Sequence, residues 1–148
     1  MWNNIGLCCF FSAQYDMALS AFEKALALSD DSNNADVWYN IGHVGIGVGD
    51  LGLAYKAFKI AVSHNPNHAE AFNNLGVLEL RKANIEQARS NFTTSQKLSQ
   101  YGFEAFFNAA LINEKKGEFS ECYIMIKKAL EIFPEHVDSK ELLKKLSG

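Results

Sequence analysis

The 148 residues, 48% hydrophobic and 21% charged, can bury a continuous core, and the net charge of -3 leaves no basic excess for binding nucleic acid or an anionic membrane surface. No apolar stretch approaches the roughly 20 residues that cross a bilayer, and the first residues lack the basic and then apolar pattern of a signal peptide. Three cysteines without a Cys-x-x-Cys motif form no disulfide framework, so we expect a cytoplasmic chain with no nucleic-acid partner and no direct membrane insertion.

A five-residue motif recurs from the N-terminus onward. It reads Trp-Asn-Asn-Ile-Gly from Trp2, Trp-Tyr-Asn-Ile-Gly from Trp38, Phe-Asn-Asn-Leu-Gly from Phe72 and Phe-Phe-Asn-Ala-Ala from Phe106, at spacings of 36, 34 and 34 residues. A small residue and a large apolar one follow each motif at a constant distance: Ala18 and Phe22, Ala54 and Phe58, Ala88 and Phe92, Cys122 and Ile126. This pattern over 34 residues is typical of tetratricopeptide repeats, each a pair of helices.

The predicted elements follow the repeats in chain order. First helices are expected near 2–12, 36–48, 70–82 and 104–116, and second helices near 15–28, 52–64, 86–98 and 119–132. A last helix near 137–146 is expected to cover the final apolar face with Val137, Leu142, Leu143 and Leu146. The polar linker 29–34 is two residues longer than the repeat allows and is predicted to be a solvated loop.

These elements predict an all-α fold: a right-handed α-solenoid of four tetratricopeptide helix pairs plus a C-terminal capping helix. We expect a single domain over 1–148, with repeats at about 1–34, 35–68, 69–102 and 103–136 and a cap at about 137–146. The first motif begins out of phase with a complete repeat, which predicts a fragment of a longer protein. The recurring glycines, Gly6, Gly42 and Gly76, are expected to let the two helices of a pair approach closely.

The first helices carry the predicted partner-binding residues, because stacked repeats line a concave groove with these helices. Asn4, Asn40, Asn74 and Asn108 occupy one repeat position, and an Asn ladder with both donors and acceptors suits an extended peptide backbone. The alternative is that these amides only satisfy local backbone groups. Other groove candidates are Tyr39, His43, Asn73, Arg81 and Lys115.

Rim charges of both signs border the predicted groove. Asp36, Glu70 and Glu104 are expected at one rim, and Arg81, Lys82, Lys115 and Lys116 at the other. Charges at a rim affect association rates more than affinity.

No catalytic, cofactor or metal site is predicted. Residues 47–52 match G-x-G-x-x-G, but here the glycines join two helices, whereas a dinucleotide site requires them to follow a strand. The four histidines, including His68 and His136, are scattered, and neither they nor the cysteines have zinc-ligand spacing. Cys8 and Cys9 lack a His and carboxylate pair to activate them and are interpreted as packing residues.

Several segments between the repeat positions resemble one family more specifically. These are 7–10, 15–17, 35–44, 67–75, 77–82, 86–89 and 133–138, which read LCCF, YDM, ADVWYNIGHV, NHAEAFNNL, VLELRK, EQAR and FPEHVD. Together they are similar to the C-terminal repeats of the tetratricopeptide-repeat subunits of the BBSome, the Bardet-Biedl syndrome complex. The resemblance implies a subunit of a coat that carries membrane-protein cargo in cilia. It further implies other BBSome subunits as partners, one of them small and extended, and a location at basal bodies and pericentriolar material.

Two other functions stay open at this point. A stand-alone co-chaperone-like clamp for a C-terminal carboxylate would need Lys or Arg early in the groove, where Asn3, Leu7, Tyr39, His43 and Asn73 stand instead. A substrate-selecting arm of a larger enzyme is compatible with an Asn-lined superhelix.

Overall fold

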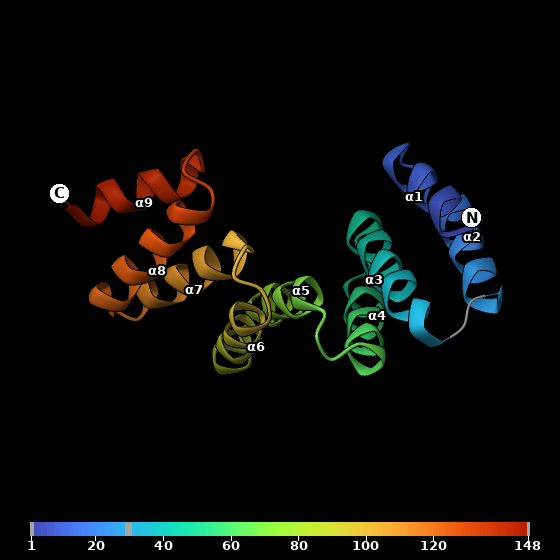
Figure 1. The fold of residues 1–148 in the computed structure, drawn as a ribbon, viewed down its shortest axis with the longest axis horizontal. Coiled ribbons are helices and arrows are strands. Elements are labelled where there is room, and N and C mark those ends of the chain that lie inside the picture. The colour runs from blue at the N-terminus through green and yellow to red at the C-terminus, as the bar shows by residue number, and fades with distance from the viewer. Residues whose placement is uncertain (1, 29–30, 148) are drawn as a thin grey trace. The chain divides into compact units, whose positions relative to one another are not determined.

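The computed structural model describes residues 2–28 and 31–147 and forms them into helices joined by short turns (Figure 1). Nine helices and no strand occur within these two ranges. They are α1 (Trp2–Phe11), α2 (Tyr15–Leu28), α3 (Asp31–Val48), α4 (Leu51–His64), α5 (Ala69–Arg81), α6 (Ile85–Leu98), α7 (Phe103–Lys115), α8 (Phe119–Ile132) and α9 (Val137–Ser147). The predicted all-α class of helix pairs with a final capping helix is confirmed.

Eight of these helices lie within one or two residues of their predicted bounds, and α3 does not. It begins at Asp31, five residues before the predicted start. The predicted loop is therefore wrong for 31–34, which form the first turn of this helix, while 29 and 30 lie outside the described residues. Short polar residues favour helix starts as well as loops, so the composition of this linker did not distinguish the two.

Two compact units make up the chain. Unit 1 is Met1–Ala71, with α1 to α4 and the start of α5, and unit 2 is Phe72–Gly148, with the rest of α5 and α6 to α9. The single domain over 1–148 stays a prediction.

The core of unit 1 is built from the recurring glycines and the phenylalanines that face them. A Cβ added to Gly6 would lie 2.4 Å from the ring of Phe22, and one added to Gly42 would lie 2.5 Å from the ring of Phe58. Both rings are fully buried, and so is Ala54 at the contact between α3 and α4. The predicted close approach within each pair is confirmed, because no side chain larger than hydrogen fits at these glycines without moving the ring.

Unit 2 uses the same contact once and then a variant of it. A Cβ on Gly76 would lie 2.5 Å from the Phe92 ring, as in unit 1. In the last pair, Ala110 on α7 belongs to one buried cluster with Ile126 on α8. A larger residue on one helix thus accompanies a smaller one on its partner, which keeps the contact filled without overlap.

The helix-pair turns place one residue at a recurring position in the left-handed region. These residues are Ala13 (φ 59°), Gly49 (φ 82°), Ala83 (φ 63°) and Gly117 (φ 75°). Glycine adopts this conformation without strain and alanine does not. Gly49 also belongs to the G-x-G-x-x-G match, which spans the turn between α3 and α4 and follows a helix instead of a strand.

The capping helix α9 covers the end of the last pair. Leu142 joins the cluster of Ala110, Cys122 and Ile126. Val137, which the pattern placed on the buried side, is 62% exposed, and Ser139 is fully buried instead. Ser139, Leu142, Leu143 and Leu146 have the i, i+3, i+4, i+7 spacing of one helix face, and the Ser139 hydroxyl also contacts His136 Nδ1 at 2.6 Å.

Candidate partner-binding surface

Two equivalent hydrogen bonds link the first helices of consecutive repeats, one in each unit. In unit 1, the side-chain amide of Asn40 on α3 donates to Oδ1 of Asn3 on α1 at 2.8 Å. In unit 2, the amide of Asn108 on α7 donates to Oδ1 of Asn73 on α5 at 3.1 Å. In both bonds, the recurring Asn of one repeat contacts the residue just before the recurring Asn of the preceding repeat. The predicted ladder of recurring Asn residues did not include this pairing.

The other two ladder residues lie beside these bonds without making them. Asn4 is exposed on α1, and Asn74 is half-buried on α5 and has an interaction of its own. An Asn amide has two N–H donors and a carbonyl with two lone pairs, so the bonded residues keep capacity for a further partner. The side of the first helices that carries these residues is called the first-helix face of each unit.

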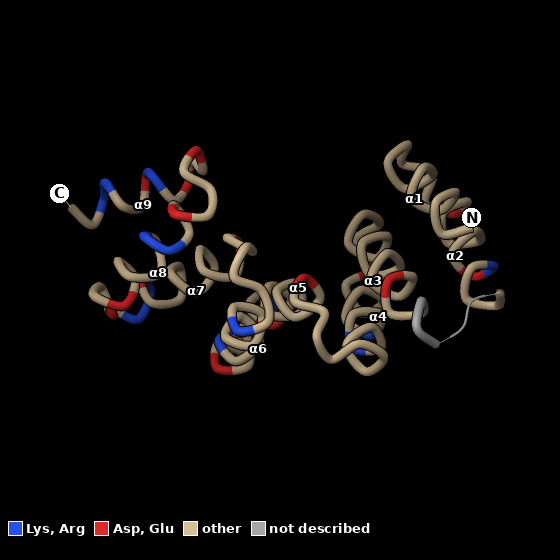
Figure 2. Tube along the Cα trace, in the orientation of Figure 1, with Lys and Arg blue, Asp and Glu red and all other residues tan. Residues whose placement is uncertain are grey.

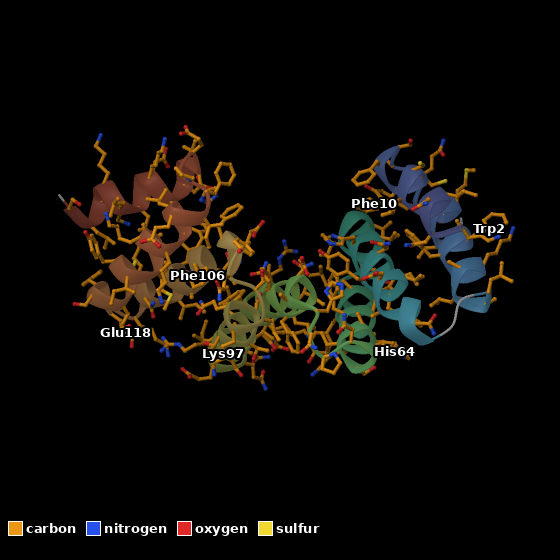
Figure 3. The ribbon with its side chains drawn as sticks, viewed as in Figure 1. Trp2, Phe10, His64, Lys97, Phe106 and Glu118 are labelled. Carbon is orange, nitrogen blue, oxygen red and sulfur yellow. The ribbon has the colours of Figure 1, made fainter. Side chains whose placement is uncertain are left out.

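An aromatic cluster adjoins the Asn40–Asn3 bond in unit 1. The ring of Tyr39 lies 4.6 Å from that of His43, edge to face, and 5.7 Å from that of Phe58. His43 also contacts Phe10, whose ring centroid is 6.2 Å away; Phe10 is labelled near the end of α1 in Figure 3. Burial among these rings lowers the pKa of His43, which favours its neutral form.

His68 is buried at the start of α5, and sequence reasoning missed its role. Its Nδ1 accepts a hydrogen bond from the backbone N–H of Ala71 at 3.2 Å, which caps α5. Its ring lies 4.6 Å from that of Tyr39. Asp36 Oδ1 is 3.4 Å from Nε2, and Glu70 Oε2 is 3.5 Å from Nδ1. The sequence offered one signal of this role, because His68 and His136 both occupy the last position of a repeat.

Unit 2 places His136 at the equivalent position in different surroundings. Its ring lies 4.7 Å from that of Phe103, 4.9 Å from Phe107 and 5.9 Å from Phe133. At the two repeat positions of Phe103 and Phe133, unit 1 has Ala35 and Asn65. Aromatic rings therefore pack around the capping histidine of unit 2, and that of unit 1 has more polar neighbours.

A hollow of about 450 Å³ opens on the first-helix face of unit 1. It brings together two of the predicted binding residues, Tyr39 and Asn40, with two of the three predicted rim acids, Asp36 and Glu70. The full lining is Asn3, Leu7, Asp36, Tyr39, Asn40, His68 and Glu70. Two carboxylates, an amide pair and a phenol in one hollow suit the recognition of a polar or cationic group.

Arg81 and Lys115 are not part of these clusters. Each is exposed at the last residue of its helix, α5 and α7 respectively. The neighbouring Lys116 pairs with Glu86, and this contact lowers the pKa of the Glu86 carboxyl. Arg81, Lys115 and Lys116 are exposed, and their place at the rim of a partner-binding groove stays a prediction.

A larger hollow of about 950 Å³ lies in unit 2, away from the Asn108–Asn73 bond. It involves the start of α8 and the end of α9, with Phe119, Tyr123 and Ile124 among its apolar residues. Lys145 donates to Glu114 at 2.8 Å beside it, and this bond raises the pKa of Lys145. No sequence motif had indicated this hollow, because its residues lie outside the repeat positions.

Within 2–28 and 31–147, no group of three or more His, Cys, Asp or Glu side chains has the geometry to hold a metal ion. Among the same residues, no helix is both long enough and apolar enough to cross a membrane. All three cysteines are free thiols, and burial raises the pKa of Cys122.

Comparisons with known proteins agree with the repeat assignment. A family model described as tetratricopeptide repeat matches residues 1–32, 35–68 and 103–136. Tetratricopeptide repeat protein 8 of Mus musculus is 47% identical over 84% of this chain and 24% of its own length. The Caenorhabditis elegans protein of the same name is 43% identical over 97% of this chain and 28% of its own. The chain thus spans about a quarter of the length of these relatives.

A solved structure supports the same conclusion. YrrB, described as a TPR protein with an unusual peptide-binding site, superposes with a TM-score of 0.76 at 26% identity, covering 97% of this chain and 73% of its own. The family model matches more than half of the chain. The relatives named tetratricopeptide repeat protein 8 support the more specific resemblance of the segments between the repeat positions. The chain therefore belongs to the tetratricopeptide-repeat family, with tetratricopeptide repeat protein 8 among its relatives.

Proposed function

We propose that the chain is a non-catalytic protein-interaction scaffold whose first-helix faces hold an extended segment of a partner protein. The observation that carries this proposal is the hollow of unit 1, where Tyr39 and Asn40 meet Asn3 on the neighbouring repeat. Partly buried amides with remaining donors and acceptors suit a peptide backbone, whose groups recur along its length. The family supports the same reading, since its repeats serve as binding surfaces.

The whole protein is proposed to be a subunit of the BBSome, the coat that carries membrane-protein cargo in cilia. Similarity to tetratricopeptide repeat protein 8 at 43–48% identity supports this assignment. Its partners would then be other BBSome subunits, with a small extended subunit as the candidate for the first-helix faces. The matching location is the cytoplasm near the cilium, at the basal body and pericentriolar material.

A capture experiment tests both levels of the proposal. The tagged chain is incubated with an extract of ciliated cells, and the bound proteins are identified by mass spectrometry. We expect BBSome subunits. Recovery of chaperones alone, released by a peptide with a free acidic C-terminus, would instead support a co-chaperone clamp.

A pair of variants then locates the surface. Asn40→Ala combined with Asn74→Ala is expected to weaken capture at least about tenfold, as losing one or two hydrogen bonds to a partner does. The melting temperature should fall by no more than about 4 °C, because Asn40 also loses its bond to Asn3. Asn91→Ala, on the second helix α6, is the matched control and should leave capture intact. Undiminished capture by the double variant would remove the first-helix faces from the interaction.

A further inference from the structure

The hollow on the first-helix face of unit 1 carries two exposed carboxylates around a buried histidine. Asp36 and Glu70 lie on either side of the His68 ring and are each 71% exposed. His68 is only 9% exposed, and its Nδ1 is occupied as the acceptor of the Ala71 N–H. Most of each carboxylate side chain therefore remains accessible to a partner from outside the chain.

Basic residues are absent from the described walls of this hollow. None of its lining residues is Lys or Arg. The sequences of α1 and α3 contain no Lys or Arg at all, and the described parts of both helices are free of blue in Figure 2. A cation from outside the chain would therefore meet two exposed carboxylates without competition from a Lys or Arg on these walls.

The remaining lining residues fit the rest of a basic side chain. Tyr39 supplies an aromatic ring, which attracts a guanidinium or ammonium group within about 6 Å of its centroid. Leu7 offers an apolar contact for the aliphatic stem. The carbonyls of Asn40 and Asn3 are further acceptors, and guanidinium has five donors to distribute among such groups.

We propose that this hollow binds an arginine or lysine side chain of the partner segment, with Asp36 and Glu70 as its charge partners. The inference rests on the proposed function, because it assigns the chemistry of one position in the segment that the first-helix face of unit 1 holds. It predicts a partner with a basic residue where the chain passes Tyr39.

Unit 2 supplies an internal control. Its equivalent acids are Glu104 and Asp138, at the repeat positions of Asp36 and Glu70. There the capping histidine bonds Ser139 and packs against phenyl rings at the positions of Ala35 and Asn65. If binding depends on the polar hollow and not on exposed acids alone, it should occur in unit 1 and not at the equivalent acids of unit 2.

The test is a titration of the ¹⁵N-labelled chain, followed by NMR, with N-acetyl-arginine methylamide. We expect saturating shifts of the amide signals of Tyr39, Asn40 and His68, with a dissociation constant of about 1–10 mM, as one charge-assisted contact gives. The neutral isostere N-acetyl-citrulline methylamide should bind at least about fivefold more weakly, because it lacks the charge. Equal binding of the two probes, or no saturating shift with the arginine probe, would overturn the proposal.

Two double variants assign the charge partners. Asp36→Asn with Glu70→Gln should weaken binding of the arginine probe at least about fivefold, and Glu104→Gln with Asp138→Asn should leave it unchanged. An equal loss in both would show that general surface charge attracts the probe and would overturn the site. Raising the salt from 50 to 500 mM should weaken the binding by the unmodified chain severalfold, a readout that needs no variant.

The failure of this inference is distinguishable from failure of the proposed function. If the chain captures BBSome subunits and the Asp36→Asn, Glu70→Gln variant captures them equally well, the basic-residue site is wrong and the scaffold stands. If no BBSome subunit is captured while the arginine probe binds as expected, the site stands and the assignment to that complex fails.

Discussion

Units 1 and 2 make the same amide bond between first helices but surround their capping histidines differently. Asn40–Asn3 and Asn108–Asn73 are equivalent, whereas His68 faces two carboxylates and His136 faces phenyl rings. The residues that differ are few, and they lie outside the glycine–phenylalanine contacts that join each helix pair. Repeat packing therefore fixes where a surface lies, and the intervening residues decide its chemistry.

The glycine–phenylalanine contact of unit 1 should have the largest effect on stability. Phe58 is fully buried against Gly42, so Phe58→Ala removes its packing and leaves a cavity that costs about 3–5 kcal/mol in the free energy of unfolding. Urea denaturation monitored by circular dichroism measures this loss. Phe11→Ala, at a ring that is 80% exposed, is the control and should change stability by less than about 0.5 kcal/mol.

The last pair of unit 2 predicts how a mutation at this contact can be rescued. Gly42→Ala forces a Cβ into the Phe58 ring and should cost about 1–3 kcal/mol by overpacking. Adding Phe58→Ile recreates the Ala110–Ile126 combination and should recover part of that loss. A double-mutant cycle measures the coupling between the two sites. Strictly additive effects would contradict the size compensation inferred from unit 2.

The turn residues provide a smaller effect of opposite sign. Ala83 has a φ of 63°, where unit 1 has Gly49 in its second turn. Ala83→Gly relieves the left-handed strain but increases the entropy of the unfolded chain, so we expect a net gain of about 0.5–1 kcal/mol. Thermal denaturation should show a higher melting temperature. The reverse change, Gly49→Ala, should lower it, and an increase there would contradict this account of the turns.

The smallest predicted effect is a pH dependence specific to unit 1. Burial lowers the pKa of His43 below its ordinary value of 6.5, so the folded chain resists protonation at this site. The corresponding stability is present above pH 6.5 and is lost as the pH falls through the lower folded-state pKa. His43→Leu introduces the residue that unit 2 has at the equivalent position, Leu111. This change should remove the part of the acid-induced loss of stability that His43 causes, which corresponds to less than about 3 °C in melting temperature. His64→Leu, at an exposed histidine, should leave the acid loss unchanged.

The sequence predicted the helices and their close contacts well because both depend on short, regularly spaced motifs. Gly42 and Phe58 belong to such motifs, and their contact formed as expected. The start of α3 was missed because its residue types suit a loop as well as a helix N-terminus. The role of His68 was missed because it depends on Asp36 and Tyr39, which belong to the other end of the same repeat and are brought beside it only when its helices fold together.

The central claim, that the first-helix face of unit 1 contacts a partner, is tested most directly by hydroxyl-radical footprinting of the intact complex. Tyr39 on α3 and Tyr55 on α4 are both partly buried in unit 1, one on a first helix and the other on a second helix. We predict that assembly with the partner subunits lowers the oxidation rate of Tyr39 severalfold and leaves that of Tyr55 unchanged. An unchanged rate at Tyr39, or protection of Tyr55 alone, would contradict the account.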